Sequence, residues 1–328
     1  MKRFFLFSVT YLVLAMIILF MFRDAPVTQL VDSVARTKDT VSAFVKYFPY
    51  LAVALGAIFL ATRQFANKNM AKEAAWAFAG CLIFSTAFTF VKTSMPYIQP
   101  FYADVLFANW DKALHGGVDP WVWTHKFAPY ISEKAVATLY FIIWGLPAAF
   151  LPFIIAATDN DEARKRRFVI LYCFVWIGLG NVVALLGSSV GPVYYDRLLG
   201  GERFADLIGA LGASGIAGGK IGVVQDGLWR IYSEYSQSIG SGISAFPSVH
   251  VGVSTLTMLY LCERSKWLAP VGIAFLAAIQ FCSVYIGWHY AIDGYFSFAA
   301  VLGVWFGLRI WANRRAPETQ ISGQHAVA

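Results

Sequence analysis

Charged side chains are scarce in this sequence. Asp, Glu, Lys and Arg make up 14% of its 328 residues, whereas soluble domains usually contain about 25%. Hydrophobic residues account for 58% of the chain and aromatic residues for 17%. This balance excludes an ordinary soluble domain and is typical of a protein that is embedded in lipid.

Cysteine is also rare, and its placement excludes two further classes of protein. The four cysteines fall inside apolar segments, far from one another: Cys81, Cys173, Cys262 and Cys282. They therefore form neither a disulfide framework nor a metal-ligand cluster. We interpret them as small apolar packing residues. No internal repeat is visible, and the polar segment after Arg315 is expected to be disordered.

Long apolar runs dominate what is present. A membrane-spanning helix needs roughly 20 mostly apolar residues, and windows of about this length occur at 4–22, 48–66, 74–94, 135–157, 168–187, 248–263, 267–286 and 291–311. The first run is too long for a signal peptide and has no small-residue cleavage site before Arg23, so we interpret it as a retained helix. The sequence predicts an all-α, polytopic membrane helix bundle with about eight transmembrane helices.

The distribution of the net charge of +7 predicts the orientation of the bundle. With a cytoplasmic N-terminus, the excess of Lys and Arg falls on short segments of one side, including 163–167 and 313–315. The positive-inside rule then places both termini in the cytoplasm. A basic excess that is explained by topology gives no reason to expect a nucleic-acid partner. Three long segments, 23–47, 92–134 and 188–247, are left on the outer side.

The outer segment 92–134 contains an amphipathic pattern. Apolar residues recur at helical spacing against Asp104, Asp111 and Lys112; they are Phe101, Val105, Leu106, Trp110 and Leu114. Gly116 and Gly117 end the pattern. We predict an interfacial helix that forms a collar on the membrane surface and places His115 and His125 at the interface. The glycine-rich segment 188–247 has the composition either of a substrate lip or of a plain linker.

Three ionisable residues are expected at the outer membrane boundary. His250 stands at the outer end of the sixth span, and the seventh span returns the chain to the same face, where His289 and Asp293 follow. His289 and Asp293 are four residues apart and share a face on a helix. The carboxylate can then accept the Nδ1 proton of the imidazole, which leaves Nε2 as an activated nucleophile.

A second histidine supplies the complementary chemistry. The imidazolium of His250 can protonate a leaving oxygen, while Ser248 and the backbone amides of the helix start at Val249 offer donors to a phosphate. The set predicts phosphoryl transfer through a phosphohistidine. Two alternatives remain: interfacial histidines that only bind water, and a metal site, which no cysteine or further carboxylate on that face completes.

These segments resemble a known family. "FPSVH" (246–250) and "HYAID" (289–293) resemble the second and third signature motifs of the type 2 phosphatidic acid phosphatase superfamily. "SAFPSVH" and "WHYAID" are most similar to its inositol phosphorylceramide synthase branch. The resemblance implies that His289 is the phosphorylated nucleophile, that Asp293 orients it and that His250 is the acid. It also implies a six-helix phosphatase-type core without a metal or other cofactor.

The resemblance sets the expected domain organisation and location. Two N-terminal helices (1–73) would precede the six-helix catalytic domain (74–312), and a cytoplasmic tail (313–328) would follow it. Because this branch has many bacterial members, the bacterial inner membrane is the expected location, with the active site facing outward.

The phosphate-binding cations of the phosphatases are missing here. Ala184 and Gly191 stand at the basic positions of the first motif, and Cys282-Ser283 replaces the Ser-Arg that opens the third. The synthase branch also lacks parts of this set and has a Pro-aromatic stretch like "GPVYY" (191–195), which favours that branch. A buried phosphate still needs a cation. We expect Arg197, beside Tyr194 and Tyr195, to supply it; further candidates are Arg230, Lys220 and Lys92.

The predicted function is that of a lipid phosphotransferase or phosphatase at the extracytoplasmic face. The resemblance favours transfer of a phospho-headgroup; the substrate would be a phospholipid, a ceramide-like lipid or a polyprenyl phosphate in the bilayer. The alternative is a catalytically silent lipid-binding or lipid-translocating protein of the same fold. A transporter lacks support, because the spans contain no mid-span charges and no matching pair of broken helices.

Overall fold

The computed structural model describes residues 1–28, 68–234 and 242–314, together with positions 31, 48–50, 52–53 and 56–57. Within these residues every regular element is a helix. Most of the predicted window at 48–66, and all of the predicted tail at 313–328 except residues 313 and 314, lie outside the described residues.

The other predicted windows coincide with helices. In the part of the chain that the structure describes, five helices are long and apolar enough to cross a membrane: Lys2–Phe22 (α1), Asn69–Ile98 (within α4, Lys68–Ile98), Glu133–Thr158, Glu162–Leu186 and Ala291–Arg314 (α16). Two of them are composite, with a π-helical stretch between α-helical ends: α7 (Glu133–Ala137), η2 (Thr138–Ile143) and α8 (Gly145–Thr158), then α9 (Glu162–Cys173), η3 (Phe174–Val183) and α10 (Ala184–Leu186). Helices α14 (Val249–Arg264) and α15 (Ala269–Tyr285) are shorter. The structure confirms a polytopic helical bundle.

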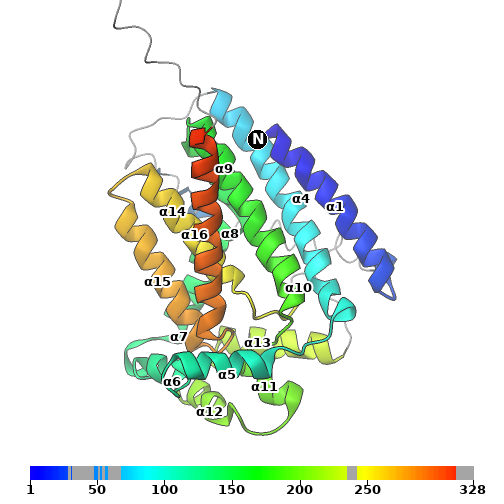
Figure 1. Ribbon diagram of the computed structural model, residues 1–328, viewed down its shortest axis with the longest axis vertical. Coiled ribbons are helices and arrows are strands. Elements are labelled where there is room, and N and C mark those ends of the chain that lie inside the picture. Colours follow the sequence, from blue (N-terminus) through cyan, green and yellow to red (C-terminus); the bar gives the residue numbers. More distant parts are fainter. Residues whose placement is uncertain are drawn as a thin grey trace, which may run out of the picture.

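Helices α1 and α4 run side by side in the same direction (Figure 1). The amino group of Met1 pairs with Glu73 at one end, and Arg23 donates to the carbonyl of Thr93 over 2.6 Å at the other. The domain boundary expected at residue 73 falls inside α4, so no helix boundary marks it.

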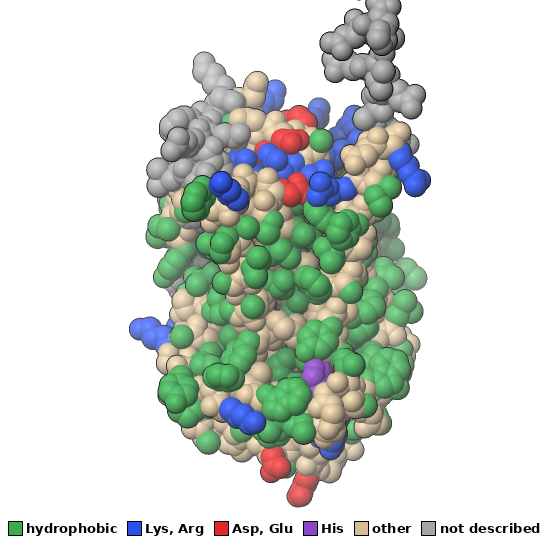
Figure 2. All heavy atoms as spheres, turned by 60° about the vertical axis from the view of Figure 1, so that its left-hand side comes forward, with side chains coloured by type: hydrophobic (Ala, Val, Ile, Leu, Met, Phe, Trp, Pro, Cys, Tyr) green, Lys and Arg blue, Asp and Glu red, His purple; other side chains and the backbone are tan. Residues whose placement is uncertain are grey.

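The two ends of the bundle differ in structure and charge. The α8–α9 and α14–α15 connections lie at the end where the chain begins, while the opposite end is covered by short helices (Figure 1). These are α5 (Asp104–Leu114), α6 (Pro120–His125), α11 (Pro192–Leu199), α12 (Ala205–Ala213) and α13 (Lys220–Ser233), called here the short-helix layer. Figure 2 shows basic side chains gathered at the first end, above an apolar belt. The exposed surface, with an apolar belt below a charged end, is therefore typical of a membrane protein.

Helix α14 lies inside the bundle, packed against α15, α16, α8 and η3. Its hydroxyl side chains tolerate this burial because each donates to the carbonyl four residues earlier: Ser254, Thr255 and Thr257 bond to His250, Val251 and Val253, each over 2.8 Å. Its first residues lie directly beneath the short-helix layer. This placement brings His250 into the interior rather than onto the surface.

Candidate functional site

The structure brings the two predicted histidines into direct contact. His250 lies in the first turn of α14, and His289 lies in the turn between α15 and α16. Nε2 of His289 is 3.3 Å from Nδ1 of His250, and the ring centroids are 5.5 Å apart. Residues 39 positions apart in the sequence therefore form one pair, at the end of the bundle beneath the short-helix layer.

The tautomer of His289 follows from its partners. Nδ1 lies 2.8 Å from the carbonyl oxygen of Ala245 and 3.3 Å from Oδ2 of Asp293. A carbonyl only accepts, so Nδ1 carries the hydrogen and Nε2 carries the lone pair. The hydrogen between the two rings then belongs to Nδ1 of His250. The sequence predicted Asp293 as the acceptor, whereas the shorter contact is made by Ala245.

An aromatic cage holds the ring of His250. Tyr140 stacks on it with centroids 4.3 Å apart and planes 23° apart, and Trp144 lies 4.1 Å away. The indole nitrogen of Trp144 also donates to the His250 carbonyl over 2.9 Å. Both residues come from the span 133–158 and share a helix face. Sequence reasoning did not include them, although their four-residue spacing was visible.

Two buried carboxylates of α5 tie the site together. Asp104 accepts from the backbone N–H groups of Val190 and Gly191, each over 2.9 Å, and from the hydroxyl of Tyr290 over 3.0 Å. Asp111 accepts from Ala291 N and Ile292 N, each over 3.1 Å, at the start of α16. Burial raises the pKa of both carboxyl groups, although the donors oppose this shift. Helix α5 thus holds two segments next to His289: residues 190–191 and residues 290–292.

This arrangement corrects the expected orientation of α5. The helix is amphipathic as predicted, but Asp104 and Asp111 are only 1% and 4% exposed, whereas an interfacial helix ordinarily turns its charged face to water. Val105 and Trp110 of the apolar stripe are exposed instead. The spacing of seven residues between the two acids was the signal for a shared inward face.

Gly191 joins two segments of the site. It adopts a positive φ of 87°, and a Cβ atom there would stand 2.5 Å from the carbonyl oxygen of Trp288. Two residues further along the chain, the backbone N–H of Val193 donates to the carbonyl oxygen of Gly287 over 2.8 Å. The "GPVYY" stretch therefore packs directly on the turn that holds His289.

The expected phosphate-binding residues have other partners. Ser248 is fully buried and caps α14 by accepting from Val251 N over 3.3 Å, with Val249 beginning the helix. Tyr194 is buried and donates to the Gln225 carbonyl over 2.9 Å, and Tyr195 packs edge-on against Phe204. Arg197 is exposed and pairs with Asp226 over 2.8 Å. Arg230 and Lys220 are exposed, and Lys92 is half-buried in α4. Their roles remain predictions.

Within the described residues, no group of three or more His, Cys, Asp or Glu side chains has the arrangement of a metal site. His115 and His125 are half-exposed in the short-helix layer. Nδ1 of His115 contacts the Asp111 carbonyl oxygen at 2.6 Å, and Nδ1 of His125 contacts that of Trp121 at 3.1 Å. Both histidines therefore have local partners of their own.

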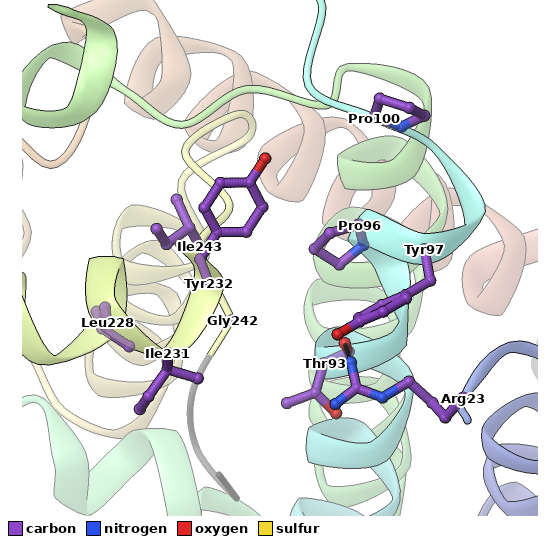
Figure 3. A pocket seen from close by; sticks show the side chains of 10 residues that line it. All are labelled: Arg23, Thr93, Pro96, Tyr97, Pro100, Leu228, Ile231, Tyr232, Gly242 and Ile243. Atoms are coloured by element: carbon purple, nitrogen blue, oxygen red, sulfur yellow. Dashed lines mark hydrogen bonds between the residues drawn. The ribbon is translucent and has the colours of Figure 1, made fainter. Parts of the chain in front are cut away.

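A groove of about 230 Å³ lies close to the site, between α4 and α13 (Figure 3). Its lining is mainly apolar and aromatic, with one guanidinium: Arg23, Thr93, Pro96, Tyr97, Pro100, Leu228, Ile231, Tyr232, Gly242 and Ile243. Arg23 lies over the ring of Tyr97, 4.1 Å from its centroid. Gly242 and Ile243 precede by two or three residues the carbonyl of Ala245 that bonds to His289.

Comparison with known proteins identifies the family. No curated protein and no solved structure matches the chain. The family model of the PAP2 superfamily matches residues 105–308, more than half of the chain. The matched segment includes the histidine pair, Asp293 and Asp111 of α5, whereas Asp104 lies just before it. The chain belongs to the PAP2 superfamily.

Proposed function

We propose that the protein is an integral-membrane lipid phosphotransferase or phosphatase that acts through a phosphohistidine on His289. Members of the PAP2 superfamily are generally phosphatases or phosphotransferases, and a membrane-embedded fold suggests lipid substrates in a bilayer. The main support from the geometry is the contact between Nε2 of His289 and Nδ1 of His250. Two ring nitrogens at this separation can both reach one phosphorus atom, which supports the roles of nucleophile for His289 and acid for His250.

The residues define a reaction in two steps. The phosphate displaces the hydrogen bond between the rings, and the Nε2 lone pair of His289 attacks phosphorus. The bond from phosphorus to the leaving oxygen breaks, and protonated His250 donates its proton to that oxygen. In the second step water or an alcohol attacks the phosphohistidine, His250 removes the proton of the attacking group, and the N–P bond breaks. Asp293, 3.3 Å from Nδ1, stabilises the positive charge that develops on the His289 ring.

We propose transfer to a lipid or inositol hydroxyl, as in the synthase branch, in preference to hydrolysis. The support is the resemblance of "SAFPSVH" and "WHYAID" together with the stretch 191–195, which packs on the His289 turn. The groove of Figure 3 has the lining that an apolar lipid chain needs. Burial of a chain contributes about 0.8 kcal/mol per methylene group to binding.

The experiment that tests this function is a phosphoenzyme assay. Purified full-length protein is mixed with a ³²P-labelled lipid phosphate in the presence of EDTA and quenched within milliseconds. We expect label on the protein that survives alkali and is released by acid, which is the behaviour of a phosphohistidine, and we expect EDTA to leave its amount unchanged. The absence of both label and turnover over a panel of phospholipid, ceramide-phosphate and polyprenyl-phosphate substrates would exclude the enzyme. Loss of label in EDTA, restored by a metal ion, would indicate a metal-dependent reaction.

We further propose that the short-helix layer and the histidine pair face the outside of a bacterial inner membrane and that both termini are cytoplasmic. The support is the basic end of the bundle, where the first turns of α9 contain Arg164, Lys165, Arg166 and Arg167.

Cysteine labelling in intact cells tests the orientation. Glu202→Cys, in the short-helix layer, and Lys266→Cys, between α14 and α15, both introduce a thiol at an exposed position. A membrane-impermeant maleimide should label only the first variant, whereas both should react after permeabilisation. The unmodified protein is the control for the native cysteines. The reverse pattern would contradict the proposed orientation.

A further inference from the structure

We infer that Lys92 is the cation that binds the substrate phosphate, an inference that rests on the proposed function. A phosphate in a site of low dielectric needs a positive charge nearby, because an uncompensated anion there is very costly. Lys92 lies outside the residues that match the family, so membership of the family does not assign this role.

The helix face that carries Lys92 points toward the start of α14. Phe88 and Lys92 are four residues apart on α4 and share this face. A ring carbon of Phe88 and Cγ2 of Val249 both crowd Gly180, at 2.9 and 3.1 Å from the place where a Cβ would stand. Phe88 is therefore next to the residue that precedes His250, and Lys92 lies one helical turn closer to the short-helix layer.

The side chain of Lys92 lies along the segment that supports both histidines. Its Cγ and Cε atoms are 3.1 and 3.5 Å from the Cβ position of Gly242. From Gly242 the chain continues to the Ala245 carbonyl, which bonds to Nδ1 of His289, and then to α14. The Lys92 charge acts electrostatically on both imidazole rings. Among the candidate cations of the sequence, Lys92 is the one for which the described contacts show this proximity.

Lys92 also lacks a competing partner. Across the described ranges, its ammonium group makes no ion pair and no hydrogen bond with the protein. By contrast, Arg197 pairs with Asp226 over 2.8 Å and Arg203 pairs with Asp119 over 2.6 Å. A half-buried cation that no carboxylate compensates decreases stability. A bound phosphate would supply the missing negative charge.

The neighbouring groove fits the same ligand. Gly242, which lies against Lys92, also lines the groove between α4 and α13 (Figure 3). A lipid phosphate combines an anionic head with an apolar chain, and Lys92 lies against Gly242 and directly precedes Thr93, both of which line the mainly apolar groove. The ligand class that this combination fits is a lipid phosphate or phosphodiester.

The test compares Lys92→Met with Lys92→Arg in the purified full-length protein, with Lys126→Met, at an exposed lysine directly after α6, as the matched control. The probe is orthovanadate, a phosphate analogue, whose inhibition constant against turnover and whose direct binding are both measured. We expect Lys92→Met to weaken vanadate binding by about tenfold or more, equivalent to about 1.4 kcal/mol, and to raise KM more than it lowers kcat. Lys92→Arg should recover most of the affinity, and Lys126→Met should change it by less than about twofold.

Thermal unfolding distinguishes binding from a structural role. Removal of an uncompensated ammonium should leave the Tm of Lys92→Met equal to or above that of the parent protein. A lowered Tm without rescue by Lys92→Arg would overturn the inference. So would normal vanadate affinity in Lys92→Met while the parent protein turns over lipid phosphate, and the proposed function would then stand. If the parent protein neither turns over lipid phosphate nor binds vanadate, the proposed function fails, and this inference fails with it.

Discussion

His289→Ala is expected to lower turnover by more than about 10⁴-fold and to abolish the labelled phosphoenzyme. The reason is that, in the proposed mechanism, Nε2 of His289 provides the lone pair that bonds to phosphorus, while the neighbouring His250 has the role of acid. His250→Ala should lower turnover of a lipid substrate by about 10² to 10⁴-fold, the usual contribution of a general acid. Both variants should still insert and purify, because the hydrogen bonds of Asp104 and Asp111 that hold segments 190–191 and 290–292 remain.

A substrate with a good leaving group separates the two roles. A p-nitrophenyl phosphate ester leaves without protonation, so the defect of His250→Ala should shrink on this substrate, while that of His289→Ala should persist. His125→Ala is the control, because this histidine lies in α6 with its own carbonyl partner, and it should change turnover by less than about threefold. Turnover and protein-bound label that survive His289→Ala would rule out His289 as the nucleophile. Lipid binding that survives both substitutions, without any turnover in the parent protein, would favour the silent lipid-binding alternative.

Asp104→Ala is expected to produce the largest loss of stability. The substitution leaves the N–H groups of Val190 and Gly191 and the hydroxyl of Tyr290 without their acceptor in a buried site. An unsatisfied buried donor costs about 1–3 kcal/mol, so the free energy of unfolding should fall by about 3 kcal/mol or more. The measurement is unfolding of the purified protein in mixed detergent micelles, together with its Tm.

The matched control is Asp206→Ala. This carboxylate lies on the exposed face of α12, and its removal should change the free energy of unfolding by less than about 0.5 kcal/mol. Asp104→Asn should also destabilise the protein, because its amide keeps one acceptor oxygen but turns an NH2 group toward a backbone N–H that an oxygen of Asp104 accepts. Equal stability of Asp104→Ala and Asp206→Ala would show that the hydrogen bonds of Asp104 do not hold the site.

The length of the apolar runs predicted the membrane-spanning helices well. The windows at 4–22 and 291–311 differ from α1 and α16 by only a few residues, because a stretch of about 20 apolar residues in lipid has little alternative to a helix. The sequence also predicted that His250 and His289 lie at the same membrane boundary, because each stands at the outer end of its span. The geometry at 3.3 Å could not be predicted, since it depends on the packing of α14 against the turn after α15.

The orientation of α5 shows a limit of the amphipathic pattern. The pattern separates a polar face from an apolar face but does not say which one meets solvent when lipid lies on the outside. Here the exposed side chains are Val105 and Trp110, while Asp104 and Asp111 serve backbone donors inside. Lys92 was a weak candidate for a related reason: its proximity to Gly242 is a contact across 150 positions of sequence, which no local pattern reveals.

The crowding around Gly191 restricts how this lineage can change. The phosphatase-like pattern would have an arginine at this position, but any side chain there would collide with the Trp288 carbonyl oxygen, 2.5 Å from the Cβ position. An arginine at residue 191 would therefore displace the loop that contains His289. Proteins of this superfamily with an arginine at the equivalent position should differ in the backbone path of the segment equivalent to 287–290.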